Sequence, residues 1–81
     1  MLSTKQLSAL RRAEGAPNRL RAAMALGEVT QVEVAAAIGV TQPHVSEIVN
    51  GNYSRLPLQT AQKLAEFFGC SIDDLFPSVA A

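Results

Sequence analysis

The stretch from Thr30 to Gly51, TQVEVAAAIGVTQPHVSEIVNG, constrains the fold more than any other part of the chain. Gly39 divides it into two short segments, and each segment carries apolar residues at helical spacing. Because glycine adopts a left-handed backbone at little cost, Gly39 fits the end of one helix and the turn into the next. The stretch therefore predicts two short helices that cross closely at this turn.

The first of these helices has a clear beginning and a narrow apolar stripe. Thr30 can cap it, and Glu33 three residues later completes a capping box. The predicted buried stripe consists of Val34, Ala35 and Ile38. A larger side chain at Ala35 would push the second helix away, so the pattern predicts close helix packing at this residue.

The second helix, residues 42–50, separates an apolar stripe from a polar face. Thr41 is a favourable N-cap, and Pro43 falls in the first turn, where its missing N–H costs nothing. The stripe consists of Val45, Ile48 and Val49, and the opposite face consists of Pro43, Ser46, Glu47 and Asn50, flanked by Gln42. Two short helices joined by a glycine turn are typical of a helix-turn-helix motif, whose second helix enters the major groove of DNA.

These residues resemble the Xre family of phage-repressor-like and Cro-like helix-turn-helix domains. The matching elements are TQxExA at 30–35, Ile38-Gly39-Val40, Thr41-Gln42-Pro43, Ile48-x-Asn50-Gly51 and Ile72-Asp73-Asp74-Leu75-Phe76. The resemblance covers about residues 18–77 and implies an all-α, lambda-repressor-like bundle of five to six short helices. It divides the chain into an extra N-terminal helix at 1–17, a DNA-binding domain at 18–77 and a short tail at 78–81.

The resemblance also implies roles for single residues. In the family, the glutamine that opens each motif helix contacts DNA, the first a phosphate and the second a base; Gln31 and Gln42 match these positions. The asparagine before the last glycine contacts phosphate, and Asn50 matches it. Pro43 and Glu47 depart from the family pattern, at positions that often carry base-reading polar residues, so the motif predicts DNA binding without specifying the target sequence.

Four residues are predicted to read bases: Gln42, Pro43, Ser46 and Glu47. Gln42 can donate and accept at once, which suits the N6 and N7 edge of adenine, and Ser46 is small enough for close approach. Pro43 either touches a thymine methyl group or only stiffens the helix start. Glu47 accepts from cytosine N4, repels wrong sites, or is simply a solvated charge.

Phosphate contacts are predicted for a second, larger set of polar residues. Its members are Gln31, His44, Asn50, Asn52, Tyr53, Arg55, Arg19 and Arg21. The polar loop after the second helix fits phosphate oxygens, which position a protein without reading sequence, or is an ordinary surface loop. Since the stretch from Thr30 to Gly51 contains no Lys or Arg, positive charge for the phosphates must come from Arg19, Arg21 or Arg55.

Helices are also predicted on both sides of the motif. One covers residues 3–14 and stops at Gly15, and another begins at Asn18, which can cap it, and reaches about Leu26. The first of these helices completes the domain, forms a dimer surface, or lies along DNA through Arg11 and Arg12.

After the motif, Pro57 starts a helix with a stripe of Leu58, Ala61, Leu64, Ala65 and Phe68. Ser71 caps a last short helix, in which Asp73 and Asp74 complement the dipole and Leu75 and Phe76 point inward.

Charge is balanced overall but unevenly distributed along the chain. The net charge is zero, with five Lys or Arg against two Glu in residues 1–30 (+3) and two against five acidic residues in 31–81 (−3). This asymmetry favours either a basic edge facing DNA with an acidic far side, or separate solvated helix faces. A neutral protein is expected to have modest non-specific affinity for DNA, because phosphate neutralisation drives that binding.

Composition argues against several other classes of protein. The single Cys70 excludes an internal disulfide and a cysteine-based metal cluster, and a small buried hydrophobic role is expected for it. There is no apolar run long enough for a membrane span and no signal core, so a cytoplasmic location is expected. One histidine, one cysteine and no paired carboxylates in an apolar setting predict no enzyme and no cofactor or metal.

The sequence therefore predicts a DNA-binding regulator of transcription that acts as a repressor. It would bind double-stranded DNA as a homodimer, on a near-palindromic operator with half-sites about 34 Å apart. The alternative is an antitoxin-like interaction module that neutralises a toxin partner and also regulates its own operon.

Overall fold

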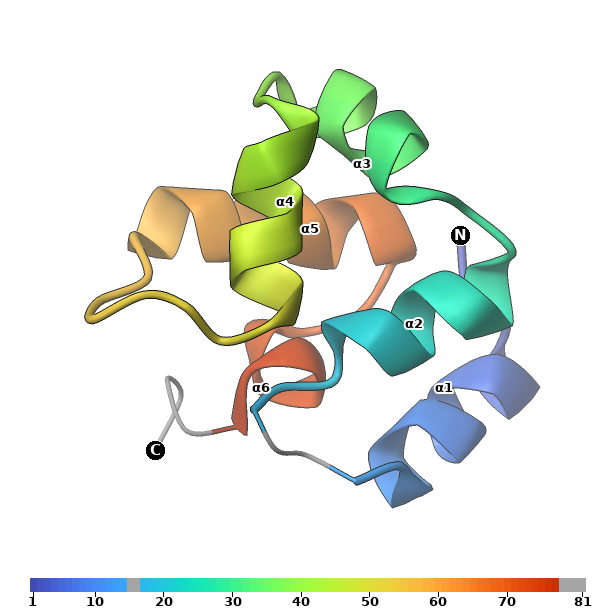
Figure 1. Cartoon of the computed structure of the whole chain (residues 1–81). Coiled ribbons are helices and arrows are strands. Elements are labelled where there is room, and N and C mark those ends of the chain that lie inside the picture. Colours follow the sequence, from blue (N-terminus) through green and yellow to red (C-terminus); the bar gives the residue numbers. More distant parts are fainter. Residues whose placement is uncertain (15–16, 78–81) are drawn as a thin grey trace.

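Six helices make up the described part of the chain, which in this computed structural model comprises residues 1–14 and 17–77 (Figure 1). They are α1 (Thr4–Arg12), α2 (Leu20–Gly27), α3 (Gln31–Ile38), α4 (Gln42–Val49), α5 (Leu58–Phe68) and α6 (Ile72–Leu75). The predicted all-α bundle of five to six short helices is confirmed. The predicted stop at Gly15 and the tail at 78–81 lie outside the described residues.

All six helices share one hydrophobic core. α3 packs against α4 and α5, α2 contacts α1 and α4, and α6 contacts α1 and α5. Each helix contributes at least one fully buried side chain, namely Leu10, Leu20, Val34, Val45, Phe68 and Leu75 in chain order. Because burial of apolar surface is the main stabilising force, the orientation of α4 depends on packing from every part of the chain.

The predicted apolar stripe of α5 is correct for four of its five members. Ala61, Leu64, Ala65 and Phe68 are buried, but the prediction for Leu58 is wrong, because its side chain is 60% exposed. Leu58 is the first residue of α5, so it lies before the turn at which the helix meets the core. Leu56, two residues earlier in the loop, is buried instead.

The N-terminal segment is part of the core rather than an appendage. Ser3 caps α1 and forms a capping box with Gln6, and the helix ends at Arg12, two residues earlier than predicted, because Ala13 is extended. Leu2 and Leu10 are buried, and the Leu2 N–H donates to the Phe68 carbonyl at 2.9 Å. α1 therefore joins the bundle by packing, as the first of its three predicted roles requires.

An ion pair between Arg11 and Asp74 connects α1 to α6. Arg11 Nε and Nη2 donate to the two carboxylate oxygens of Asp74 at 2.8 and 3.3 Å. The Asp74 side chain, only 9% exposed, also accepts from the Ser71 N–H, which completes a capping box. The hydrogen bond from Arg11 outweighs the cost of burial and holds the pKa of Asp74 at about 2, below its usual value.

We expect this carboxylate to make folding stability depend on pH in the acid range. Its pKa is lower in the folded chain than in the unfolded one, so its contribution is complete above about pH 4 and is lost as the pH falls towards about 2. Urea unfolding of the wild type and of Asp74→Asn across this range measures the effect. The difference in stability between the two proteins should shrink as the pH falls.

Asp73→Asn is the matched control, because Asp73 is the exposed neighbour on the same short helix. It should leave the acid dependence of the wild type unchanged. Parallel pH profiles for the wild type and Asp74→Asn would show that the ion pair does not stabilise the fold.

Candidate nucleic-acid interface

The two helices predicted from Thr30 to Gly51 form as α3 and α4. The Thr30 hydroxyl accepts from the Glu33 N–H at 3.2 Å, and Glu33 in return accepts from the Thr30 N–H at 3.0 Å. Gly39 has a left-handed backbone, with φ of +78°, and the N–H groups of Gly39 and Val40 both donate to the Ala35 carbonyl. Thr41 then caps α4 by accepting from the His44 N–H. The helix-turn-helix prediction is therefore confirmed in its local detail.

α4 buries one stripe and exposes the other. Val45, Ile48 and Val49 are at most 2% exposed, as predicted. The side chains turned to solvent are those of Gln42, Pro43, Glu47 and Asn50, while His44 and Ser46 are half-buried. The four predicted base-reading residues thus all lie on the outer side of α4. Ser46 is less exposed than the other three.

Gln31 and Gln42 are joined by a hydrogen bond between the first turns of α3 and α4. Gln42 Nε2 donates to Gln31 Oε1 at 2.6 Å. The side-chain carbonyl oxygen and one N–H of Gln42 stay available for other hydrogen bonds, as do the two N–H donors of the Gln31 amide. A pre-formed pair of this kind orients Gln42 before any ligand is present.

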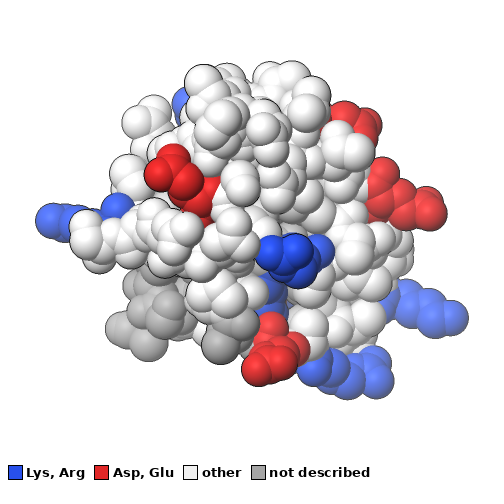
Figure 2. Space-filling model, viewed as in Figure 1, with Lys and Arg blue, Asp and Glu red and all other residues white. Residues whose placement is uncertain are grey.

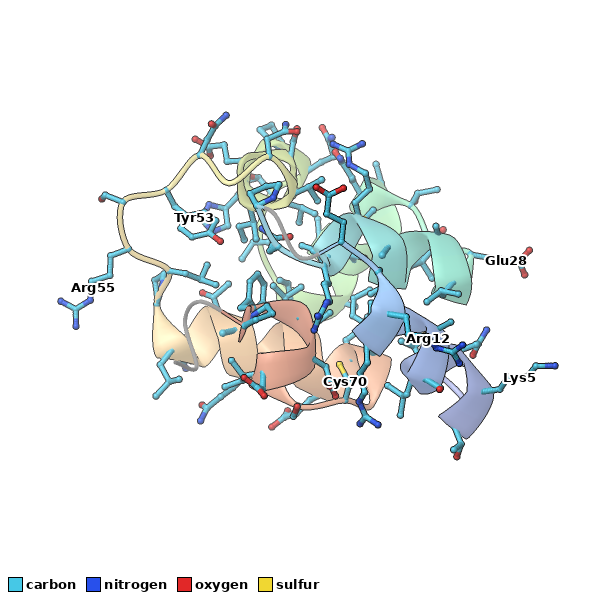
Figure 3. All side chains as sticks on the ribbon, turned by 90° about the horizontal axis from the view of Figure 1, so that it is seen from below. Lys5, Arg12, Glu28, Tyr53, Arg55 and Cys70 are labelled. Atoms are coloured by element: carbon cyan, nitrogen blue, oxygen red, sulfur yellow. The ribbon has the colours of Figure 1, made fainter. Side chains whose placement is uncertain are left out.

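The loop after α4 carries the predicted phosphate-contacting residues in two settings. Asn50, Asn52 and Arg55 are exposed, whereas Tyr53 is half-buried. Figure 3 shows Arg55 extending outward from the loop, while Tyr53 lies nearer the body of the protein. The Asn52 N–H donates to the Glu47 carbonyl at 2.8 Å, so the loop begins as a continuation of α4.

The two arginines of the α2 region differ in position. Arg21 Nη2 donates to Asn50 Oδ1 at 3.0 Å, which brings a positive charge to the end of α4. Arg19 instead donates to the backbone carbonyls of Ala13 and Asp74 at 3.3 and 3.5 Å. The structure therefore does not group Arg19 with the other candidates, and its phosphate contact stays a prediction.

Charges of both signs lie scattered on the face that carries α4, among uncharged side chains (Figure 2). On α4 itself, His44 Nδ1 lies 3.9 Å from Glu47 Oε1, and both side chains are more than two-fifths exposed. Lys5 and Arg12 lie on the other side of the molecule from Arg55 (Figure 3). The excess positive charge of residues 1–30 is thus not gathered beside α4.

In the part of the chain that the structure describes, no three His, Cys, Asp or Glu side chains come together as a metal site, and no helix is long and apolar enough to cross a membrane. Partial burial, with the nearby charge of Asp74, raises the pKa of the Cys70 thiol to about 11. A thiol with this pKa is mostly protonated at neutral pH, which lowers its reactivity as a nucleophile.

Sequence reasoning assigned Asn18 only the role of a helix cap. Asn18 Oδ1 accepts from the Leu20 N–H at the start of α2, although the N-cap position itself is Arg19, and Asn18 is also buried against the end of α4. Asparagine before an apolar helix is a common cap signal, and the sequence alone holds no sign of a partner 30 residues away.

Comparison with known proteins agrees with this geometry. Residues 20–75 match the family model described as helix-turn-helix. An uncharacterized HTH-type transcriptional regulator of Methanocaldococcus jannaschii is 37% identical over 59 residues, which cover 73% of this chain and 88% of that protein. No solved structure matches the chain significantly. With more than half of its residues matched and both motif helices in place, the chain belongs to the Xre-like helix-turn-helix family.

Proposed function

We propose that the protein is a sequence-specific DNA-binding regulator of transcription that reads its operator through residues 42–50. The observation that carries this proposal is the exposed outer side of α4, which begins at Gln42 and is held from α3 by Gln31. A short helix with one buried stripe and one polar side fits the major groove. The relative from Methanocaldococcus jannaschii, an HTH-type transcriptional regulator by name, supports the same role.

In the proposed complex, Gln42 recognises an adenine. Its free N–H donates to N7 while its carbonyl oxygen accepts from N6. Gln31, already bonded to Gln42, turns its amide donors to the neighbouring phosphate. Ser46, Pro43 and Glu47 complete the reading surface, and Glu47 favours cytosine through N4 or disfavours sites that place phosphate near its charge.

Most of the phosphate contacts in this proposal come from the loop after α4. Asn50, Asn52, Tyr53 and Arg55 follow the helix, and Arg21 adds a charge beside Asn50. His44 contributes from the flank of α4. Because few of these groups are cationic, the salt dependence of binding is expected to be shallow.

The protein would act in the cytoplasm as a homodimer and repress by occupying a promoter. A two-fold symmetric dimer places two α4 helices in successive major grooves, about 34 Å apart, so the operator is near-palindromic. No cofactor and no catalytic step is needed for such a mechanism.

Selection of bound sequences from a random duplex pool tests this function. We expect one enriched motif that is a near-palindrome with half-sites about one helical turn apart. A pool without enrichment would contradict sequence-specific binding, and a single asymmetric half-site would contradict the homodimer. Purification from the native host addresses the antitoxin-like alternative, which requires a second protein in stoichiometric amount.

A further inference from the structure

Asn18 is a buried amide that links three parts of the fold. Asn18 as a whole is only 6% exposed. Nδ2 donates to the Ile48 carbonyl in the last turn of α4 at 2.7 Å, and Oδ1 accepts from the Leu20 N–H at the start of α2 at 3.0 Å. Nδ2 also lies 3.4 Å from the Tyr53 hydroxyl in the loop after α4.

These contacts lie at the C-terminal end of α4, where the last carbonyls have no N–H of a following helical turn to accept from. The Ile48 carbonyl accepts from the Gly51 N–H at 3.1 Å as well as from Asn18, so both of its lone pairs are used. Carbonyls at a helix end need partners from outside the helix. Asn18 therefore fixes the direction in which α4 ends and the following loop leaves it.

The residues that follow Asn18 in the chain make further contacts with α6 and with the end of α4. The Arg19 N–H donates to the Leu75 carbonyl of α6 at 2.8 Å, and Arg21 bonds the Asn50 side chain from the surface. The first turn of α4 is held separately, by the bond between Gln31 and Gln42. α4 is thus fixed at both ends, from α3 at its start and from the Asn18–Arg21 segment at its end.

We propose that Asn18 is a positioning residue for sequence discrimination, acting through the last turn of α4 and the loop after it. The inference rests on the proposed function. Hydrogen bonds to base edges weaken steeply with small changes in distance and angle, whereas contacts to phosphates are sequence-independent. A change in the direction of α4 therefore lowers affinity for the operator more than affinity for other DNA, which depends only on the phosphate contacts.

Two substitutions separate positioning from stability. Asn18→Ala removes the whole amide, and Asn18→Asp keeps the shape and the acceptor for Leu20 but removes the donor to Ile48. Affinities for the selected operator and for a scrambled duplex are measured at one salt concentration, at a temperature where circular dichroism shows the protein folded. The expected result is a fall of about tenfold in the ratio of operator affinity to scrambled-duplex affinity.

Ser3→Ala serves as the control for stability. It removes the cap of α1, which packs against α2 and α6, and should lower the midpoint of thermal unfolding. Its ratio of operator to scrambled affinity should equal that of the wild type. The same unchanged ratio in the Asn18 variants, or failure of both variants to fold, would overturn the positioning role alone. A wild type without preference for any duplex would overturn the proposed function and this inference together.

Discussion

The Gln42→Ala protein is expected to bind the selected operator about 10- to 100-fold more weakly than the wild type does, because a bidentate contact to a base is worth about 1–3 kcal/mol. The substitution also leaves Gln31 without its 2.6 Å partner, so the loss includes an orienting contact on the phosphate side. Discrimination should relax most strongly at one position of each half-site. Titration of labelled operator duplexes that vary at each position measures both effects.

Gln62→Ala provides the matched control, since Gln62 is an exposed glutamine on α5, outside the helix-turn-helix. It should bind operator DNA like the wild type. Equal affinity of the wild type and Gln42→Ala for the operator would show that Gln42 does not read a base. Because Gln42 is exposed, Gln42→Ala should leave the fold of α4 intact, so that result would concern base reading alone.

Ala35→Leu is expected to destabilise the fold more than any surface substitution discussed above. Ala35 is 4% exposed in α3, and its carbonyl accepts from both Gly39 and Val40 at the turn. A larger side chain overfills the core where α3 packs against α4 and α5, and overpacking of this kind costs about 1–3 kcal/mol. Each kcal/mol corresponds to about 4–8 °C in Tm for a domain of this size.

Ala36→Leu is the control for this prediction, because Ala36 is the exposed neighbour on the same helix. Its thermal unfolding should differ little from that of the wild type, since surface substitutions usually change stability by about 0.5 kcal/mol or less. Calorimetry of the three proteins measures the difference. Similar midpoints for the two leucine variants would mean that the core around Ala35 tolerates a larger residue.

The motif was readable in the sequence because its signals are local. Capping by Thr30 and Thr41, the left-handed Gly39 and the stripes of α3 and α4 each depend on residues within one or two turns. Such signals act through the backbone nearby, so the chain specifies them before it folds. The exposed stretch from Gln42 to Asn50 follows from the same periodicity.

Predictions failed or stayed incomplete where the answer depends on distant residues. Leu58 follows the apolar period of α5 yet is exposed, because the core ends one turn further on. The partners Arg11 and Asp74 are 63 residues apart, and no local pattern in either segment indicates the other. Arg19 and Arg21 look alike in the sequence, but one faces backbone carbonyls and the other faces Asn50.

The sequence by itself determined two crossing helices, a polar outer side on the second of them, and membership in a family of DNA-binding domains. These follow from short-range backbone chemistry and helical periodicity, which act within one segment. Only the tertiary structure decided which charges lie near that side. It also decided the orientation of α4, which Asn18 contacts at its end and Gln31 at its start. Hydrogen bonds and burial between segments far apart in the chain exist only after the whole core has closed.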